Sequence, residues 1–311
     1  YFMTNQNSAT SEGSPQPLVS IIMNCFNGEK YLKEAVDSVR AQNYKTWEVI
    51  FWDNQSTDGS AEILKSYADP RLKYFYAPKH TRLYEARNCA LEKASGEFFA
   101  FLDVDDWWCP EKLEKQVPLF NDPEVGLVCG NYWVVNEHKK KQWEQHKQLA
   151  PTGRILNDLL KDYFVGLLTL IVRRSALDSL SYPCDPRYHI IGDFDLVVRL
   201  AVDWKLDCVH EPVAFYRQHS GSESYKHRAR QVDELAGWLR EMSEVESIRS
   251  CSSWDVVNNN FIYHNAINQI LLGNKKSVYR LSKELPWGKP KLKLLFSLLL
   301  PTYYIQQRFR H

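Results

Sequence analysis

Short apolar runs alternate with amphipathic segments over the first hundred residues, which predicts strands alternating with helices. Strand-length apolar runs bounded by polar residues occur at residues 18–23, 47–52, 72–76 and 97–102. Helical spacing of apolar residues lies between them, for example at Tyr31, Leu32, Ala35, Val36 and Val39. Asn27 is the expected cap of that first helix. This alternation is typical of a Rossmann-like, doubly wound, mostly parallel α/β sheet.

The pattern divides the chain into three parts. Residues 1–16 are polar and read as a flexible leader, and the folded α/β domain is expected over residues 17–225. Within it, residues 193–202 have helical spacing and residues 208–216 resemble a strand. From residue 226 to 311 the chain becomes helical, so a C-terminal helical region is expected after the α/β domain.

Polar clusters follow three of the predicted strands, after Met23, after Trp52 and after Leu102. In doubly wound sheets, ligands bind beyond the carboxyl ends of the strands. The three clusters are therefore expected to line one crevice.

Asp103 and Asp105 form a DxD pair at one of these strand ends. Two carboxylates at this spacing can both reach a hard divalent cation that bridges phosphate oxygens. Two alternatives remain open at this stage. The segment could be a polar loop in which Asp106 caps a helix over residues 107–120. It could also carry the aspartate nucleophile of a dehalogenase-like phosphatase, although Trp107 stands where those enzymes have Thr or Val.

Three further residues carry two interpretations each. Asp53 could accept the imide N–H of a pyrimidine base, left free because later residues cap the following helix, or it could itself be a cap. Asp193 begins a helix and could act as a general base, or it could only stabilise the helix dipole. His219 follows a strand and could complete a metal shell, or it could be a half-exposed loop residue.

Taken in order, these segments resemble family 2 glycosyltransferases of the GT-A fold. Residues 20–32 (SIIMNCFNGEKYL) resemble the family's SIIIPxYNxxxYL, and residues 53–60 (DNQSTDGS) resemble its DDGSTDGS. Residues 86–88 (ARN), 94–97 (ASGE) and 101–106 (FLDVDD) resemble its aRN…A.GeyiafLDxDD, in the same order. The resemblance extends over residues 17–223.

The resemblance implies roles for particular residues. It implies that the nucleotide is bound by Phe26, Asn27, Asp53, Arg87, Asn88 and Asp103. It implies that Mn2+ or Mg2+ is held by Asp103, Asp105 and His219. Asp193 corresponds to the general base, although Gly192 stands where the family has a glutamate, and Asn24 and Asn54 replace a proline and an aspartate.

The function implied is the inverting transfer of a hexose or N-acetylhexosamine from a nucleotide-diphosphate donor to a hydroxyl of a glycan. The acceptor is expected to be a free or polyprenyl-linked glycan in surface polysaccharide or lipopolysaccharide synthesis. UDP is favoured because Asp53 suits an imide N–H. The alternative is an inactive sugar-nucleotide-binding or scaffolding protein of the same fold.

Charge is distributed unevenly, although the whole chain carries only +1. Residues 273–311 hold nine basic residues against Glu284, which gives +8 and leaves −7 on the rest: Lys275, Lys276, Arg280, Lys283, Lys289, Lys291, Lys293, Arg308 and Arg310. This tail predicts either contact with an anionic membrane or a helical cap on the catalytic domain or on a partner subunit. The apolar residues that accompany its charge are Leu292, Leu295, Phe296, Leu299, Leu300, Tyr303 and Tyr304. A nucleic-acid partner is not expected, since the chain before residue 273 is acidic and the tail contains no known nucleic-acid recognition motif.

Cysteine usage and hydropathy bear on location. The seven cysteines are an odd number without a CxxC pair, which fits reduced thiols in a cytoplasmic protein. The longest apolar stretch, within residues 292–305, is shorter than the roughly 20 residues that span a bilayer. A cytoplasmic protein, peripheral on the inner face of the membrane if the tail binds lipid, is therefore expected.

Overall fold

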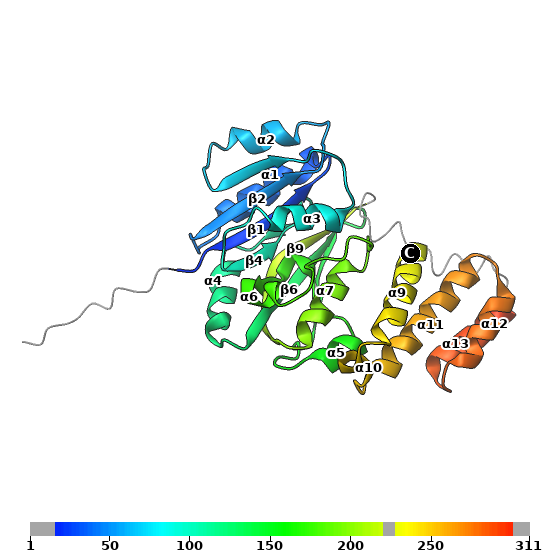
Figure 1. Ribbon diagram of the computed structural model, residues 1–311. Coiled ribbons are helices and arrows are strands. Elements are labelled where there is room, and N and C mark those ends of the chain that lie inside the picture. The colour runs from blue at the N-terminus through cyan, green and yellow to red at the C-terminus, as the bar shows by residue number, and fades with distance from the viewer. Residues whose placement is uncertain (1–15, 220–227, 301–311) are drawn as a thin grey trace, which may run out of the picture.

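A single mixed sheet forms the centre of the computed structural model, which describes residues 16–219 and 228–300 (Figure 1). Its strands are β1 Val19–Cys25, β2 Trp47–Asp53, β3 Leu72–Tyr76, β4 Phe98–Phe101, β5 Trp107–Trp108, β6 Val125–Asn136, β7 Lys141–Glu144, β8 Ile171–Arg173 and β9 Lys205–Gln218. They run in the order β3-β2-β1-β4-β8-β6-β9-β5, with β7 paired to β6. The four apolar runs expected to be strands in the first hundred residues are confirmed as β1 to β4.

Helices connect and cover the strands. Those before residue 202 are α1 Glu29–Arg40, α2 Ser60–Ser66, α3 Leu83–Leu91, α4 Lys112–Gln116, α5 Leu156–Lys161, α6 Arg174–Asp178 and α7 Gly192–Ala201, with short 3-10 turns at Val117–Asn121 and Leu167–Thr169. The later helices are α9 Arg228–Met242, α10 Glu246–Arg249, α11 Trp254–Leu271, α12 Lys275–Glu284 and α13 Lys289–Leu299. The expected doubly wound α/β fold with a helical C-terminal region is confirmed.

The register of the strands brings several strand ends to one edge. Strands β3, β2, β1 and β4 are parallel, and Cys25 lies opposite Asp53, which lies opposite Tyr76. Antiparallel β8 separates β4 from β6, and β9 runs parallel to β6. Because β8 is antiparallel to both β4 and β6, strands β6 and β9 run in the same direction as β4. Strand β9 therefore ends at the same edge of the sheet as β1, β2 and β4.

Two apolar cores lie on the opposite faces of the sheet, because successive strand side chains point to opposite faces. In β1, Ile22 joins the core with α3, α5, α7 and α9, whereas Ile21 and Met23 join the core with α1 and α2. Every residue of β1 and β2 is buried. This explains why both strands read as continuous apolar runs rather than as alternating ones.

The C-terminal helices form a smaller unit beyond α9 (Figure 1). Helix α11 contributes Val257 to the core of the sheet and Ala266, Ile267 and Ile270 to a third core with α12 and α13. None of the helices in residues 16–219 and 228–300 is long and apolar enough to cross a bilayer. The expected domain boundary at residue 225, the leader up to residue 15 and the basic residues Arg308 and Arg310 lie outside the described residues.

Two local expectations are wrong. Asn27 does not cap α1: its φ is +54°, and the helix is preceded by Gly28 without a side-chain cap. No helix spans residues 107–120, because Trp107 and Trp108 form β5 and pair with Phe215 and Ala214 of β9. Asp106 accepts the backbone N–H of Arg217 at 2.9 Å instead of capping a helix. A strand more than a hundred residues away therefore decides the conformation of this segment.

Candidate active site

The carboxyl ends of β1, β2, β4 and β9 carry most of the residues expected to bind the nucleotide or the metal. Phe26 and Asn27 follow β1, Asp53 ends β2, Asp103 and Asp105 follow β4, and His219 follows β9. The expectation that these polar clusters meet at one edge of the sheet agrees with the strand register.

The turns after β1 and β2 are tied together. The side-chain oxygen of Asn27 accepts the backbone N–H of Thr57 at 2.8 Å, and the Ser56 hydroxyl accepts the backbone N–H of Asn27 at 3.0 Å. Phe26 is 53% exposed, and its ring centroid lies 4.5 Å from that of His80. An exposed ring at a strand end, supported on one side by His80, provides a surface on which a flat base can stack.

Asp53 is not left free, which corrects one expectation from the sequence. One carboxylate oxygen accepts the backbone N–H of Ser56 at 2.7 Å, and the other accepts the hydroxyl of Tyr74 at 2.7 Å. The residue is only 1% exposed. Asp53 therefore fixes the turn after β2, and contact with a base would use a second lone pair of one of these oxygens.

Arg87 and Asn88 on α3 point to different parts of the molecule. The buried Arg87 guanidinium donates to both oxygens of Asp103, at 2.8 and 3.1 Å. The Asn88 amide instead bonds the backbone of Cys184, donating to its carbonyl at 2.8 Å and accepting its N–H at 3.0 Å. Arg87 is thus placed with the strand-end carboxylates, whereas Asn88 holds the loop that leads to α7.

Asp105 and His219 are in direct contact, with 3.0 Å between a carboxylate oxygen and Nε2 of the imidazole. Burial and the neighbouring Asp103 charge raise the pKa of the Asp105 carboxyl, while His219 opposes this shift. A divalent cation would relieve the repulsion between the two carboxylates. Carboxylate oxygens and an imidazole are suitable ligands for Mn2+ or Mg2+.

The ligand types fit a divalent cation, but their arrangement is incomplete. Within the part of the chain that the structure describes, no group of three or more His, Cys, Asp or Glu side chains is positioned to hold an ion. Asp103 is turned toward Arg87 and leaves Asp105 and His219 as the contacting pair. Diphosphate oxygens and water commonly complete magnesium coordination around one or two protein carboxylates.

Arg217 joins the DxD loop to α1 and to Glu137, which directly follows β6, and sequence reasoning missed it. Its guanidinium donates to the backbone carbonyl of Asp105 at 2.9 Å, to Glu137 at 3.0 Å and to Glu34. Tyr31 also donates its hydroxyl to Glu137, at 2.8 Å. The only signal in the sequence was the position of Arg217 two residues before His219.

Asp193 lies in the first turn of α7, and the structure explains why Gly192 precedes it. A Cβ at Gly192 would lie 2.5 Å from the ring of Tyr84, so a glutamate there would collide with this buried ring. The Tyr84 hydroxyl accepts the backbone N–H of Asp193 at 3.0 Å. Burial raises the pKa of the Asp193 carboxyl and thereby makes it a stronger base, while the Arg87 charge opposes this shift.

Helix α9 holds the loop before Asp193, another feature that sequence reasoning missed. The Glu234 carboxylate accepts three backbone N–H groups, those of His189 and Ile190 at 2.8 Å and that of Ile191 at 3.2 Å. Trp238 on the same helix donates its indole N–H to Asp195 at 3.1 Å. The position of Asp193 therefore depends on residues more than forty positions later in the chain.

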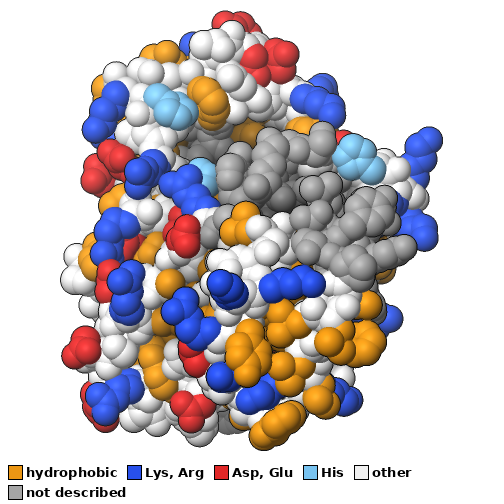
Figure 2. Space-filling model, turned by 90° about the vertical axis from the view of Figure 1, so that its right-hand side faces the viewer, with side chains coloured by type: hydrophobic (Ala, Val, Ile, Leu, Met, Phe, Trp, Pro, Cys, Tyr) orange, Lys and Arg blue, Asp and Glu red, His pale blue; other side chains and the backbone are white. Residues whose placement is uncertain are grey.

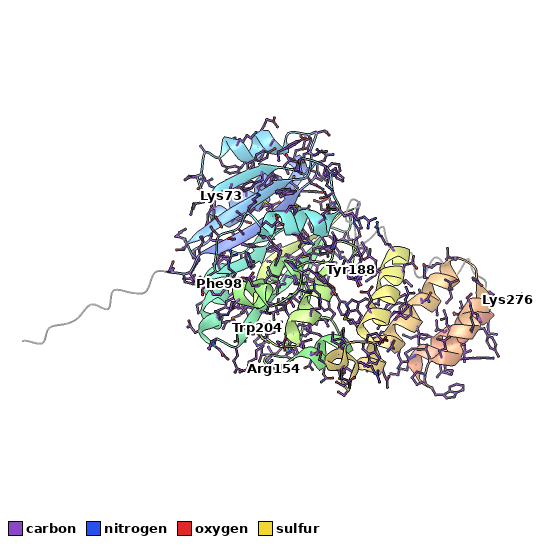
Figure 3. The ribbon with its side chains drawn as sticks, viewed as in Figure 1. Lys73, Phe98, Arg154, Tyr188, Trp204 and Lys276 are labelled. Atoms are coloured by element: carbon purple, nitrogen blue, oxygen red, sulfur yellow. The ribbon has the colours of Figure 1, made fainter. Side chains whose placement is uncertain are left out.

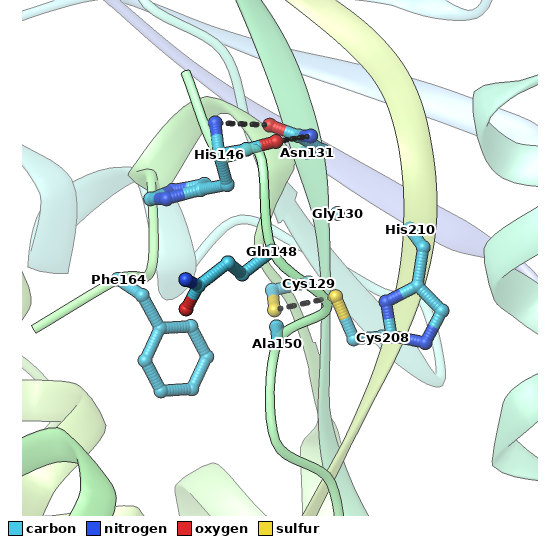
Figure 4. Close-up of a pocket in the computed structure, with 9 residues that line it drawn as sticks. All are labelled: Cys129, Gly130, Asn131, His146, Gln148, Ala150, Phe164, Cys208 and His210. Atoms are coloured by element: carbon cyan, nitrogen blue, oxygen red, sulfur yellow. Dashed lines mark hydrogen bonds between the residues drawn. The ribbon is translucent and has the colours of Figure 1, made fainter. Parts of the chain in front are cut away.

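A small cavity is lined by the paired strands β6 and β9 together with His146, Gln148, Ala150 and Phe164 (Figure 4). Cys129 and Cys208 face each other across paired strands, with 3.5 Å between their sulfur atoms. Burial contributes to a raised pKa of the Cys129 thiol, after its hydrogen bond to Cys208. None of the residues that line this cavity is among those expected to bind nucleotide or metal.

The chain is similar to one known protein family and to individual bacterial proteins. The glycosyl transferase family 2 model matches residues 20–180, more than half of the 311-residue chain. The Escherichia coli protein WfgD, a UDP-Glc:alpha-D-GlcNAc-diphosphoundecaprenol beta-1,3-glucosyltransferase, is 35% identical over 166 residues. These cover 53% of this chain and 64% of WfgD, so the match spans less than two thirds of that relative.

Solved structures show the same fold at low sequence identity. Residues 1–349 of Staphylococcus aureus TarS, solved with UDP-GlcNAc, align with a TM-score of 0.63 at 16% identity, covering 94% of this chain and 91% of TarS 1–349. The mannosyltransferase PcManGT of Pyrobaculum calidifontis, solved with GDP-Man and Mn2+, aligns with a TM-score of 0.60 at 16% identity, covering 95% of this chain and 84% of that one. The fold is GT-A, and the chain belongs to glycosyl transferase family 2.

Proposed function

We propose that this glycosyltransferase moves one sugar from a UDP-sugar to a hydroxyl of a lipid-linked glycan, with inversion at the anomeric carbon. The observation that carries this proposal is the path from Asp103 through Arg87 and Tyr84 to Asp193. The Arg87 guanidinium donates to Asp103, and its central carbon lies 4.9 Å from the centroid of the Tyr84 ring. The Tyr84 hydroxyl in turn accepts the backbone N–H of Asp193. The donor-side carboxylate and the proposed base are thus linked by one short chain of contacts.

On the donor side, Phe26 would stack on the base and Asp53 would accept its imide N–H. Asn27 would hold the turn beneath the base through its bond to Thr57. Asp103 would lie beside the ribose, fixed by Arg87, and Asn88 would act indirectly through Cys184. A UDP donor is supported by the imide preference of a carboxylate acceptor, by the UDP-Glc in the name of WfgD and by the UDP-GlcNAc with which TarS was solved.

The chemical step needs a base and a stabilised leaving group. Asp193 would remove the proton from the acceptor hydroxyl as its oxygen attacks the anomeric carbon, a role for which the raised pKa of its carboxyl is suited. Asp105, His219 and Asp103 would hold Mn2+ or Mg2+, which when bound neutralises the departing diphosphate. PcManGT, of the same fold, was solved with Mn2+.

The proposed acceptor is a glycan carried on a lipid diphosphate, by analogy with the relative WfgD. WfgD is named for an acceptor carried on diphosphoundecaprenol, and a chain related to it would act on a glycan carried by a similar lipid. Such an acceptor is consistent with a role in surface-glycan synthesis. It is also consistent with work at the cytoplasmic face of a membrane.

Replacement of the proposed base tests the mechanism. Asp193→Asn should lower turnover by about 10²–10⁴-fold, the usual contribution of general base catalysis. The variant should still bind UDP and Mn2+, as measured by the rise that they cause in the thermal unfolding midpoint. Turnover equal to that of the wild type would remove Asp193 from this role.

The donor class is tested with the unmodified protein. UDP, dTDP, GDP and CMP are each added with Mn2+ or with EDTA, because a ligand that binds only the native state raises the unfolding midpoint. A shift with UDP that requires Mn2+ is expected. A shift with GDP alone would mean that the donor base is guanine rather than uracil. No shift with any of the nucleotides would favour the inactive scaffold.

A further inference from the structure

The outer side of α13 carries large apolar side chains that are exposed and belong to none of the apolar cores. Trp287, Leu292, Phe296 and Leu299 are 76%, 55%, 63% and 79% exposed, and we call these four residues the C-terminal apolar patch. Leu292, Phe296 and Leu299 are spaced i, i+4 and i+7, which places them on one helical face. The opposite face already packs inward through Leu294 and Ser297. The patch is therefore left over after α13 has been folded against its neighbours.

Basic residues surround this patch. Lys289 and Lys293 are exposed and lie on the same face of α13 as Leu292 and Phe296, by their helical spacing. Residues 273–300 contain seven Lys or Arg residues and one acidic residue, Glu284. Figure 2 shows hydrophobic and basic side chains gathered together on this end of the molecule. Lys276 of α12 lies at the end farthest from the sheet (Figure 3).

We propose that the C-terminal apolar patch and its surrounding lysines dock on the surface of a bilayer that contains anionic lipid. A short helix with an apolar face bordered by lysines lies in the interface plane, with its apolar side chains among the acyl chains. The lysine side chains can extend to the headgroups while their stems cover apolar surface. Trp287, beside α13, is the residue type that prefers the membrane interface.

Charge argues for lipid over a second copy of the chain. A symmetric dimer through this face would bring two sets of basic residues together without acidic partners, since residues 273–300 contain a single acidic residue. An anionic surface instead gains from every lysine near it. The proposal rests on the proposed lipid-linked acceptor only for its purpose, because membrane binding is measurable without turnover.

Vesicle co-sedimentation tests the surface. The protein is mixed with vesicles of phosphatidylcholine alone or of equal parts phosphatidylcholine and phosphatidylglycerol, at low and high salt. Binding to the anionic vesicles that weakens with salt is expected. The variant Leu292→Ser/Phe296→Ser/Leu299→Ser should bind at least about tenfold more weakly, and Lys289→Gln/Lys293→Gln about tenfold more weakly.

Matched controls lie on the catalytic domain. Leu149→Ser removes another highly exposed leucine, and Lys139→Gln/Lys140→Gln removes two exposed lysines of the turn between β6 and β7. Both controls should bind vesicles as the wild type does. Equal loss in the controls and the patch variants would overturn the proposal, as would absence of binding by the wild type. A dimer in solution that the triple serine variant separates would assign the patch to a second copy instead.

The nucleotide experiment separates this proposal from the proposed function. Every patch variant should keep the thermal shift with UDP and Mn2+, which also shows that it is folded. If the wild type shows the shift without binding vesicles, only the membrane surface is rejected. If it binds vesicles without a nucleotide shift, only the donor assignment is rejected.

Discussion

The sheet and the C-terminal helices differ in how they treat their large apolar residues. Around the sheet, Phe51 and Phe99 are fully buried between helices and strands, each in one of the two cores. In the third core, six residues are buried, and none is aromatic: Ala266, Ile267, Ile270, Val278, Leu285 and Leu294. Phe296 and Trp287 of the same region face outward. Burial thus explains the aromatic residues of the sheet, whereas those of the C-terminal patch need another explanation.

The two regions also differ in the treatment of charge. Around the sheet, several buried or half-buried charges have opposite partners, as in Arg87 with Asp103 and Lys73 with Glu48. The buried Lys112 is different, because its ammonium lies over the Trp108 ring. In the C-terminal helices, Lys289 and Lys293 are exposed, and no ion pair is formed by these two within the described residues. Paired charges hold a site in place, whereas unpaired charges of one sign attract a partner of the other sign.

The largest test of this comparison replaces one phenylalanine in each region. Phe99→Ala should lower the free energy of unfolding by about 3–5 kcal/mol, because it removes a buried aromatic side chain and leaves a cavity. Phe296→Ala should change it by less than about 0.5 kcal/mol, as is usual for exposed positions. Urea unfolding of the two variants measures both values. Similar losses would mean that the C-terminal patch contributes to the fold after all.

A buried carboxylate gives the next largest effect. Glu48 accepts hydrogen bonds from Ser20 and Ser95 and an ion pair from Lys73. Burial would raise the pKa of the Glu48 carboxyl, but these partners lower it to about 2. The ordinary value is 4.5, so the resulting stability is present above about pH 4.5 and is lost as the pH falls toward 2.

Glu48→Gln measures this contribution. At pH 7 the variant should be less stable than the wild type by about 3–4 kcal/mol, given about 1.4 kcal/mol for each unit by which the pKa falls from 4.5 to about 2. The difference should shrink as the pH is lowered from 5 to 3, because the wild-type carboxyl becomes protonated in the unfolded state. A difference that stays constant with pH would show that the carboxylate charge is not what stabilises the strand.

Sequence alone predicted the first half of the sheet largely because β1, β2 and β4 are buried along their whole length. Continuous apolar runs such as residues 18–23 carry this information locally. The strand at Trp107 could not be predicted, because its pairing with Phe215 comes from β9. Likewise, the positive φ of Asn27 follows from its bonds to the turn after β2, which a capping rule for one helix does not include.

The candidate site was predicted by residue type but not by its supports. Asp103, Asp105 and Asp193 stand out in the sequence because carboxylates at strand or helix ends are chemically distinctive. Arg217 and Tyr84 do not stand out, since their partners lie about a hundred positions away. The same holds for Gly192, whose absent side chain makes sense only beside the Tyr84 ring.

Glu234 gives the smallest effect of the three and tests where the two regions meet. Its carboxylate accepts three backbone N–H groups of the loop before Asp193. Glu234→Gln should lower the free energy of unfolding by about 2 kcal/mol, since hydrogen bonds to charged groups are worth about 1.5–3 kcal/mol. Turnover should fall while the KM for the donor stays nearly constant, because the loop positions Asp193 and not the nucleotide.

A neighbour on the same helix provides the control. Glu241 pairs with Arg187 at 2.7 Å, but both side chains are largely exposed, at 43% and 59%. Glu241→Gln should therefore change the free energy of unfolding by at most about 1 kcal/mol, as exposed ion pairs do, and leave turnover unchanged. If Glu234→Gln behaves like this control, α9 does not fix the base, and it belongs functionally with the C-terminal helices. If only Glu234→Gln lowers turnover, the catalytic unit includes α9, and the C-terminal helical unit begins after it.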